Sequence, residues 1–152
     1  MTRGPGRTGI LKRFFAIVTN KTKSPFRSDL IVLAVDDDNM ILRIIEAKLT
    51  PHDYLVKTAS SGEEALKILG EITPAVLILD VMMSGISGYD VCRFVKQDER
   101  LKNIPVIFLT SRDTPEDYKK GHDLGAVMYM AKPIKPEQIL RAVQMLSATG
   151  GQ

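Results

Sequence analysis

The chain has 152 residues, 44% of them hydrophobic, and a formal net charge of +3 at pH 7, which suits one folded domain with a hydrophobic core. Its single cysteine excludes an internal disulfide, and no hydrophobic run approaches the ~20 residues that span a bilayer. Residues 1–28 hold seven Lys or Arg and no acid, so the fourteen basic and eighteen acidic residues that remain give the rest of the chain a charge of −4. This charge balance argues against direct nucleic-acid binding by the folded part. The single cysteine favours a reducing compartment, so we expect a cytoplasmic protein.

Five hydrophobic runs alternate with helical patterns from residue 29 onward. The predicted strands are 30–35, 54–59, 75–79, 106–109 and 127–131, and the predicted helices are 39–50, 61–69, 88–97, about 114–125 and 136–146. Strands that alternate with helices require right-handed crossovers and a parallel sheet. We therefore predict an α/β fold in a single domain, 29–147: a doubly wound five-stranded parallel sheet with helices on both faces. We expect residues 1–28 to form a basic extension and residues 148–152 a frayed tail.

Local signals refine this pattern. The run 54–59 is less uniformly hydrophobic than the others, which favours a place at a sheet edge. Ser61 and Thr114 stand where helices need an N-cap. The stripe of helix 88–97 is predicted to face inward through Val91, Cys92, Phe94 and Val95, which makes the cysteine a small core residue.

Polar residues end four of the predicted strands. Asp80 follows the hydrophobic run 75–79, and three further strands end in Asp36-Asp37-Asp38, Thr110-Ser111 and Lys132-Pro133. The carboxyl ends of parallel strands share one edge of the sheet, where ligands bind in open α/β sheets. We therefore expect these side chains to converge.

The converging residue types fit phosphoryl chemistry with a divalent cation. Clustered carboxylates repel one another unless a cation neutralises them or one is protonated, and all-oxygen ligation suits Mg²⁺, with Mn²⁺ as the alternative ion. Asp80 can act as a nucleophile, Lys132 can supply a positive charge, and Thr110 a hydroxyl hydrogen bond. Taken singly, each has a simpler reading: a helix cap for the Asp triplet, a solvated lysine, and a strand-end cap for the threonine.

The ordered set resembles the receiver domain of two-component response regulators. The matching segments are Val35-Asp36-Asp37, Leu77-Ile78-Leu79-Asp80, Ile107-Phe108-Leu109-Thr110-Ser111, Gly125-Ala126 and Lys132-Pro133, which together cover about residues 29–147. The resemblance implies a flavodoxin-like, CheY-like fold. It also implies a signalling phosphoacceptor that catalyses only its own phosphorylation and dephosphorylation.

The resemblance assigns a role to each residue of the set. Asp80 would accept a phosphoryl group from the phosphohistidine of a sensor histidine kinase or a histidine phosphotransfer protein. Asp36, Asp37, Asp80 and the backbone carbonyl of Met82 would hold Mg²⁺, while Asp38 caps the next helix.

The remaining implied roles concern the switch. Lys132 would pair with Asp80 and then with the phosphoryl group, and its bond to Pro133 would be cis. Thr110 would swing toward the phosphoryl group, and Tyr129 would turn inward. The output surface would be formed by roughly residues 117–124 and 129–146 and would bind a downstream protein. Formation of a homodimer is also compatible with this resemblance.

One departure from the family pattern follows the acceptor, and two further positions beside it bear on the lifetime of the phosphoryl group. Ser84 stands where the family usually has proline, so the loop after the acceptor is predicted to be looser. Met82 and Arg112 occupy the positions that border the path of attacking water and tune autodephosphorylation in the family. A thioether cannot orient water as an amide can, so we expect Met82 to influence the lifetime of the phosphoryl group.

The basic N-terminal segment lies outside the resemblance. Between residues 10 and 18 its hydrophobic residues fall on one helical face, with Lys12 and Arg13 opposite. Three readings stay open: a disordered leader, a helix on an anionic membrane surface, or a helix packed on a partner.

Two rival functions also stay open. A degenerate receiver would act as a phosphorylation-independent docking module. A phosphohydrolase of the haloacid dehalogenase type would use Asp36-Asp37-Asp38 as its Asp-x-Asp motif with Thr110 and Lys132, but it leaves Asp80 without a role.

Overall fold

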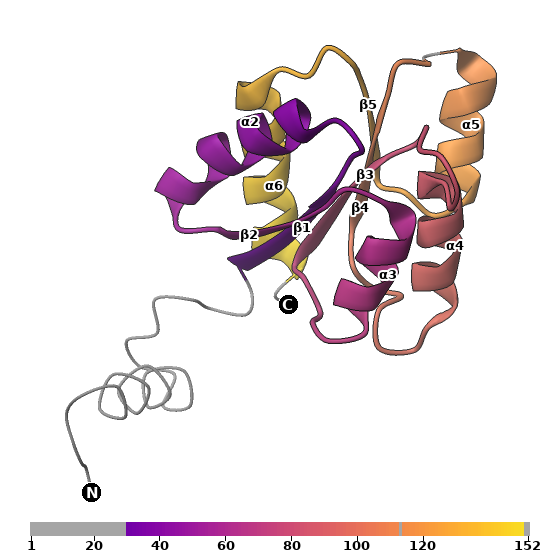
Figure 1. The fold of residues 1–152 in the computed structure, drawn as a ribbon, viewed down its shortest axis with the longest axis horizontal. Coiled ribbons are helices and arrows are strands. Elements are labelled where there is room, and N and C mark those ends of the chain that lie inside the picture. Colours follow the sequence, from indigo (N-terminus) through magenta and orange to yellow (C-terminus); the bar gives the residue numbers. More distant parts are fainter. Residues whose placement is uncertain (1–29, 113, 151–152) are drawn as a thin grey trace, which may run out of the picture.

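The computed structural model of the chain describes residues 30–112 and 114–150. Five parallel strands form one sheet in the order β2-β1-β3-β4-β5 (Figure 1). The strands are β1 (Ile31–Val35), β2 (Leu55–Ala59), β3 (Val76–Asp80), β4 (Val106–Thr110) and β5 (Met128–Ala131). The helices are α2 (Asn39–Leu49), α3 (Gly62–Leu69), α4 (Gly88–Gln97), α5 (Pro115–Asp123) and α6 (Pro136–Gly150), with a short 3₁₀ turn η2 (Thr50–His52) after α2.

This architecture confirms the predicted doubly wound sheet. The helices α2 and α6 cover one face, and α3, α4 and α5 cover the other (Figure 1). The central strands β1, β3 and β4 are buried along nearly their whole length, as expected of strands covered on both faces. The less hydrophobic β2 lies at an edge, as its composition predicted.

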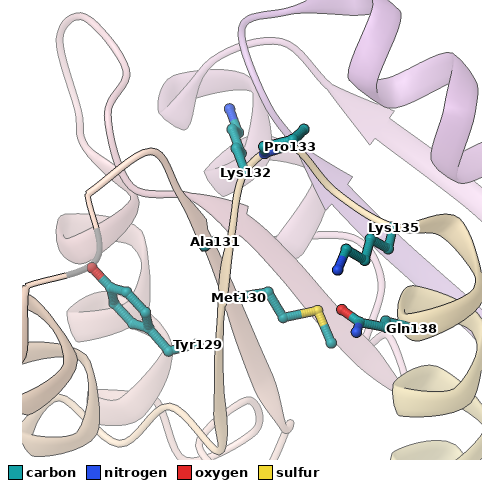
Figure 2. A pocket seen from close by; sticks show the side chains of 7 residues that line it. All are labelled: Tyr129, Met130, Ala131, Lys132, Pro133, Lys135 and Gln138. Carbon is teal, nitrogen blue, oxygen red and sulfur yellow. The ribbon is translucent and has the colours of Figure 1, made fainter.

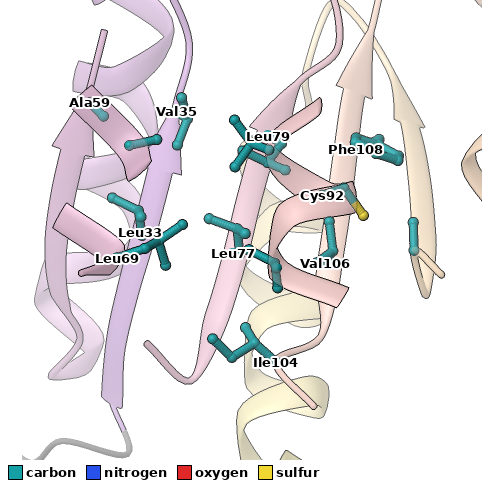
Figure 3. Packing of buried hydrophobic residues seen from close by; sticks show 14 of the residues in the cluster. Leu33, Val35, Ala59, Leu69, Leu77, Leu79, Cys92, Ile104, Val106 and Phe108 are labelled. Atoms are coloured by element: carbon teal, nitrogen blue, oxygen red, sulfur yellow. The ribbon is translucent and has the colours of Figure 1, made fainter. Parts of the chain in front are cut away.

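Two hydrophobic layers hold the sheet between the helices. On the α3–α4 side, alternate strand residues such as Leu33, Leu77, Leu79 and Phe108 pack together with Cys92 of α4 (Figure 3). On the other side, the intervening strand residues pack against hydrophobic residues of α2 and α6. Burying each large aliphatic side chain contributes about 1.5–3 kcal/mol, so both faces of the strands contribute to stability.

Capping residues fix where the helices begin. The hydroxyl of Ser61 accepts a hydrogen bond from the Glu64 amide at 3.1 Å, and that of Thr114 accepts one from the Asp117 amide at 3.2 Å. Ser87 begins α4 with a full capping box, in which Asp90 returns a bond to the Ser87 backbone. Each cap is worth about 1 kcal/mol.

Several local predictions were wrong. Phe94 is 45% exposed on α4, although the helical stripe was predicted to turn it inward, because it lies at the margin of that stripe. Helix α5 covers Pro115–Asp123 and so ends before the predicted limit near residue 125, and Gly125 follows it with a φ of +98°. Helix α6 continues to Gly150, well past the predicted end near residue 146.

A tertiary contact involves the part of α6 that lies beyond its predicted end. The Tyr54 and Ser147 hydroxyls are 2.8 Å apart, and both residues are buried. This hydrogen bond ties the last turns of α6 to the chain just before β2.

The proposed roles for residues 1–28 fall outside the described residues, and among those described no helix is long and hydrophobic enough to cross a membrane.

Candidate functional site

The register of the sheet brings the polar strand ends together. Val35 of β1 pairs with Leu79 of β3, Asp80 pairs with Leu109 of β4, and Thr110 pairs with Ala131 of β5. The residues that follow each pairing are therefore neighbours across the carboxyl edge. The site lies where helices leave the sheet toward opposite faces, the position at which doubly wound sheets bind ligands.

Three carboxylates form the centre of this edge. Asp36 and Asp80 are buried, with 0% and 2% of their surface exposed, and Asp37 is exposed beside them. One carboxylate oxygen from each lies within 4.8 Å of the others, close enough for a single ion to contact all three. Asp38 turns away as the N-cap of α2, where its Oδ1 accepts a hydrogen bond from the Met40 amide at 2.9 Å, as predicted.

Lys132 supplies the positive charge at the centre. Its Nζ is 2.9 Å from Asp36 Oδ2 and 3.2 Å from Asp80 Oδ1. The side chain reaches this position because the Lys132 amide donates to the Thr110 carbonyl at 2.7 Å, which fixes the end of β5 beside β4. The Lys132–Pro133 peptide bond is cis, as the family resemblance implied.

Few hydrogen bonds satisfy the buried carboxylates. Asp36 Oδ1 accepts from the Asp38 amide at 2.9 Å, and Asp80 Oδ1 accepts from the Met82 amide at 3.4 Å. The contact of Asp36 Oδ2 with Lys132 has ion-pair distance without hydrogen-bond geometry. This buried oxygen therefore keeps free lone pairs that another cation could use.

The electrostatics of the cluster favour a divalent cation. Burial, and then the neighbouring charge of Asp36, raise the pKa of Asp80 to about 6, although Lys132 and the Met82 amide act in the opposite direction. Burial alone would lower the pKa of Lys132, but the adjacent Asp36 and Asp80 carboxylates outweigh it and raise the pKa. Three carboxylates and one ammonium leave a formal charge of −2, and the donor set is all oxygen, which fits Mg²⁺.

Thr110 is buried beside the cluster and tied to the loop that follows β4. Its Oγ1 accepts a hydrogen bond from the Arg112 amide at 2.9 Å. Among the hydrogen bonds of the described residues, none joins Thr110 to Asp80. Thr110 thus ends the strand beside β3, and its hydroxyl is bonded to its own loop.

Tyr129 extends from β5 toward α5 rather than into the carboxylate cluster. Figure 2 shows it on the opposite side of the strand from Met130, with Lys132 beyond them at the strand end. The Tyr129 hydroxyl donates to the Arg112 carbonyl at 3.2 Å. A hollow of about 370 Å³ is lined by residues 129–133, by Lys135 just before α6, and by Gln138 in its first turn.

Sequence reasoning missed Gly88, which packs against the backbone of Asp80. A Cβ at this residue would lie 2.1 Å from the Asp80 carbonyl oxygen, so only glycine lets the start of α4 pack against the end of β3. The residues Ser87-Gly88-Tyr89 predicted where the helix starts, but nothing in them indicated this close approach.

Met82 is 51% exposed, and its Sδ lies 3.9 Å from Arg112 Nη1, so these two side chains meet across the mouth of the site.

Comparison with known proteins agrees with this geometry. Residues 32–144 match the family model described as the response regulator receiver domain. The probable transcriptional regulator ycf27 of Guillardia theta is 41% identical over 115 residues, covering 74% of this chain and 44% of that protein. The response regulator PleD of Caulobacter vibrioides is 38% identical over 116 residues, covering 76% of this chain and 26% of that protein.

Solved structures show the same fold. The chemotaxis protein CheY4 of Vibrio cholerae superposes with a TM-score of 0.72 at 33% identity, covering 76% of this chain and 97% of that one. The chain spans less than half the length of the two curated relatives that it matches. The similarity therefore concerns this one domain.

Proposed function

Because the chain belongs to the family of response regulator receiver domains of two-component systems, we propose that it accepts a phosphoryl group on Asp80 from a phosphohistidine. The donor would be a sensor histidine kinase or a histidine phosphotransfer protein. The observation that carries this proposal is the position of the Asp80 carboxylate, which lies beside two other carboxylates and within 3.2 Å of an ammonium. The chain's own chemistry would be limited to its phosphorylation and the return of the phosphoryl group to water.

Transfer requires the ionised form of Asp80. One carboxylate oxygen attacks phosphorus in line, the bond from phosphorus to the histidine nitrogen breaks, and its electron pair stays on that nitrogen. The Lys132 ammonium already lies against Asp80, so it can pair with the incoming phosphoryl oxygens. The hydroxyl of Thr110, once released from the Arg112 amide, can donate to the same group.

Asp36, Asp37 and Asp80 would hold Mg²⁺, together with the backbone carbonyl of Met82. The carboxylate oxygens are close enough to share one ion, and the free lone pairs on Asp36 Oδ2 support its use as a ligand. When bound, Mg²⁺ would neutralise negative charge on the phosphoryl oxygens. It would also favour the ionised form of Asp80, whose pKa is raised by burial and by Asp36.

We propose that phosphorylation shifts an existing equilibrium between two arrangements of the α5–β5–α6 surface. This surface would bind a downstream protein or a second copy of the chain, with no direct nucleic-acid contact. The name of the ycf27 relative refers to transcriptional regulation by that longer protein. We place the domain in the cytoplasm, where histidine kinases present their phosphoryl groups.

Intact-protein mass spectrometry tests the acceptor directly. Wild-type protein, Asp80→Asn and Asp37→Asn would each be incubated with a small-molecule phosphodonor and Mg²⁺. We expect one phosphoryl adduct on the wild type, none on Asp80→Asn, and slower formation on Asp37→Asn. An adduct that persists on Asp80→Asn would place the acceptor elsewhere, and the lack of any adduct on the wild type would favour the docking module.

A further inference from the structure

An aromatic cluster joins Tyr129 to the helices α4 and α5. The Phe108 ring meets Tyr89 and Tyr129 edge-on, with centroids 5.2 Å and 6.1 Å apart. The Tyr118 ring of α5 lies 4.6 Å from the Tyr129 ring. The ammonium of Lys120 lies 4.4 Å above the Tyr89 ring, so a cation–π contact also links α5 to α4.

Two hydroxyls in this cluster form a directed chain. The Tyr129 hydroxyl donates to the Arg112 carbonyl, which can only accept. The Tyr89 hydroxyl is 3.5 Å from the Tyr129 hydroxyl, and it must be the donor if both bonds form. Burial, and then the bond to Tyr129, raise the pKa of Tyr89, which keeps this donor protonated.

Gly121 makes room for this arrangement. A Cβ at this position would lie 2.7 Å from Cδ2 of the Tyr129 ring and 3.2 Å from Cδ2 of Phe108. Only glycine lets Tyr129 lie against α5 within reach of both the Arg112 carbonyl and Tyr89.

We propose that Tyr89 is a positioning residue for Tyr129. The Tyr89 hydroxyl donates to the Tyr129 hydroxyl and so holds it in position to donate to the Arg112 carbonyl. Because the Arg112 amide donates to Thr110, this also holds in place the segment that follows β4. Tyr89 lies on α4, so the switch extends to a helix outside the α5–β5–α6 surface. The link to phosphorylation rests on the proposed function, but the placement of Tyr129 does not.

Tyr89→Phe isolates the hydroxyl because it leaves the ring, its packing on Phe108 and its contact with Lys120 in place. A matched control is Tyr54→Phe, which removes the hydroxyl bonded to Ser147 in the hydrophobic layer on the opposite face of the sheet. The chain has four tyrosines, so ring-labelled tyrosine NMR gives four residues to assign, each by its own phenylalanine variant. Thermal unfolding of both variants measures any general loss of stability.

We expect the Tyr129 ring signals of the metal-free protein to move in Tyr89→Phe and to stay unchanged in Tyr54→Phe. We also expect the affinity for beryllofluoride with Mg²⁺, a phosphoryl analogue, to fall about two- to fivefold in Tyr89→Phe only, the range expected from one hydrogen bond. Tyr129 signals that match the wild type in Tyr89→Phe would overturn the positioning role. Unchanged beryllofluoride affinity in a variant whose Tyr129 signals do move would overturn the coupling to the acceptor.

If the wild type binds no beryllofluoride, the proposed function fails and the positioning role is still decided by the Tyr129 signals. Lys120→Gln provides a second variant, since it removes the cation above the Tyr89 ring without touching either hydroxyl. We expect it to move the Tyr129 signals in the same direction by a smaller amount. Tyr129 signals in Lys120→Gln that match the wild type would show that the cation–π contact does not help Tyr89 to position Tyr129.

Discussion

Replacing Asp80 by asparagine should stabilise the fold in metal-free buffer. The carboxylate is buried, it lies beside Asp36, and its pKa is raised from 3.8 to about 6. A carboxyl group with a raised pKa in the folded state contributes its stability below the unfolded pKa and loses it as the pH rises through the folded pKa. Near neutral pH the ionised Asp80 therefore opposes folding, and the uncharged amide removes that opposition.

The size of the effect follows from the two pKa values. A difference of about two units, at 1.36 kcal/mol each, gives a stabilisation of about 3 kcal/mol at pH 7. The same relation gives between about 1 and 2 kcal/mol at pH 5 and less than about 1 kcal/mol at pH 4. The pH dependence is the distinctive part, because a simple gain in packing would be the same at every pH.

Urea denaturation of the two proteins with EDTA at pH 4, 5, 6 and 7 measures this difference. Asp53→Asn serves as a control, since Asp53 is exposed and its positive φ of 73° suits asparagine. We expect the control to stay within about 0.5 kcal/mol of the wild type at every pH. A stability gain in Asp80→Asn that is independent of pH, or a net loss at pH 7, would show that the charge of Asp80 does not oppose folding.

Four further outcomes are expected. Added Mg²⁺ should raise the melting temperature of the wild type, and much less that of Asp37→Asn, when followed by circular dichroism. Lys132→Ala should cost roughly 2–4 kcal/mol in metal-free urea titrations, since it leaves buried carboxylates without their cation; an unchanged midpoint would contradict this. Met82→Asn should shorten the lifetime of the phosphorylated form, measured as decay of the mass adduct, because an amide can orient water; equal decay of both forms would exclude that role. Gly88→Ala should cost about 1–3 kcal/mol or more by the clash with the Asp80 carbonyl, and wild-type stability in this variant would disprove the close packing.

Strong local patterns made most of the fold predictable. Strands such as Val76–Asp80 and Val106–Thr110 are buried on both faces, so they read as short unbroken hydrophobic runs. The polar residues at their ends could be gathered into one site because parallel strands share a carboxyl edge. The predicted meeting of the triplet Asp36-Asp37-Asp38 with Asp80 and Lys132 required only this topology and the spacing along the chain, whereas the choice of Asp36 and Asp37 within the triplet came from the family resemblance.

The missed features depend on contacts between distant residues. Nothing local distinguishes Phe94, at the margin of a hydrophobic stripe, from the buried residues of the same helix. The part of α6 beyond residue 146 contacts Tyr54, which lies 93 residues before Ser147. The need for glycine at Gly88 and Gly121 arises from backbone and ring atoms that meet those positions only in the folded chain.

The carboxylates and the ammonium of the site come from strands that have different numbers of neighbours in the sheet. Asp36 and Asp80 extend from β1 and β3, each held by a neighbour on both sides, whereas Lys132 follows β5, which has one neighbour in the sheet. An outward displacement of β5 would break one ladder of hydrogen bonds, and a similar movement of β3 would break two. We therefore expect Lys132 to be held in place less strictly than the two carboxylates, which lets it follow a phosphoryl group bound at Asp80.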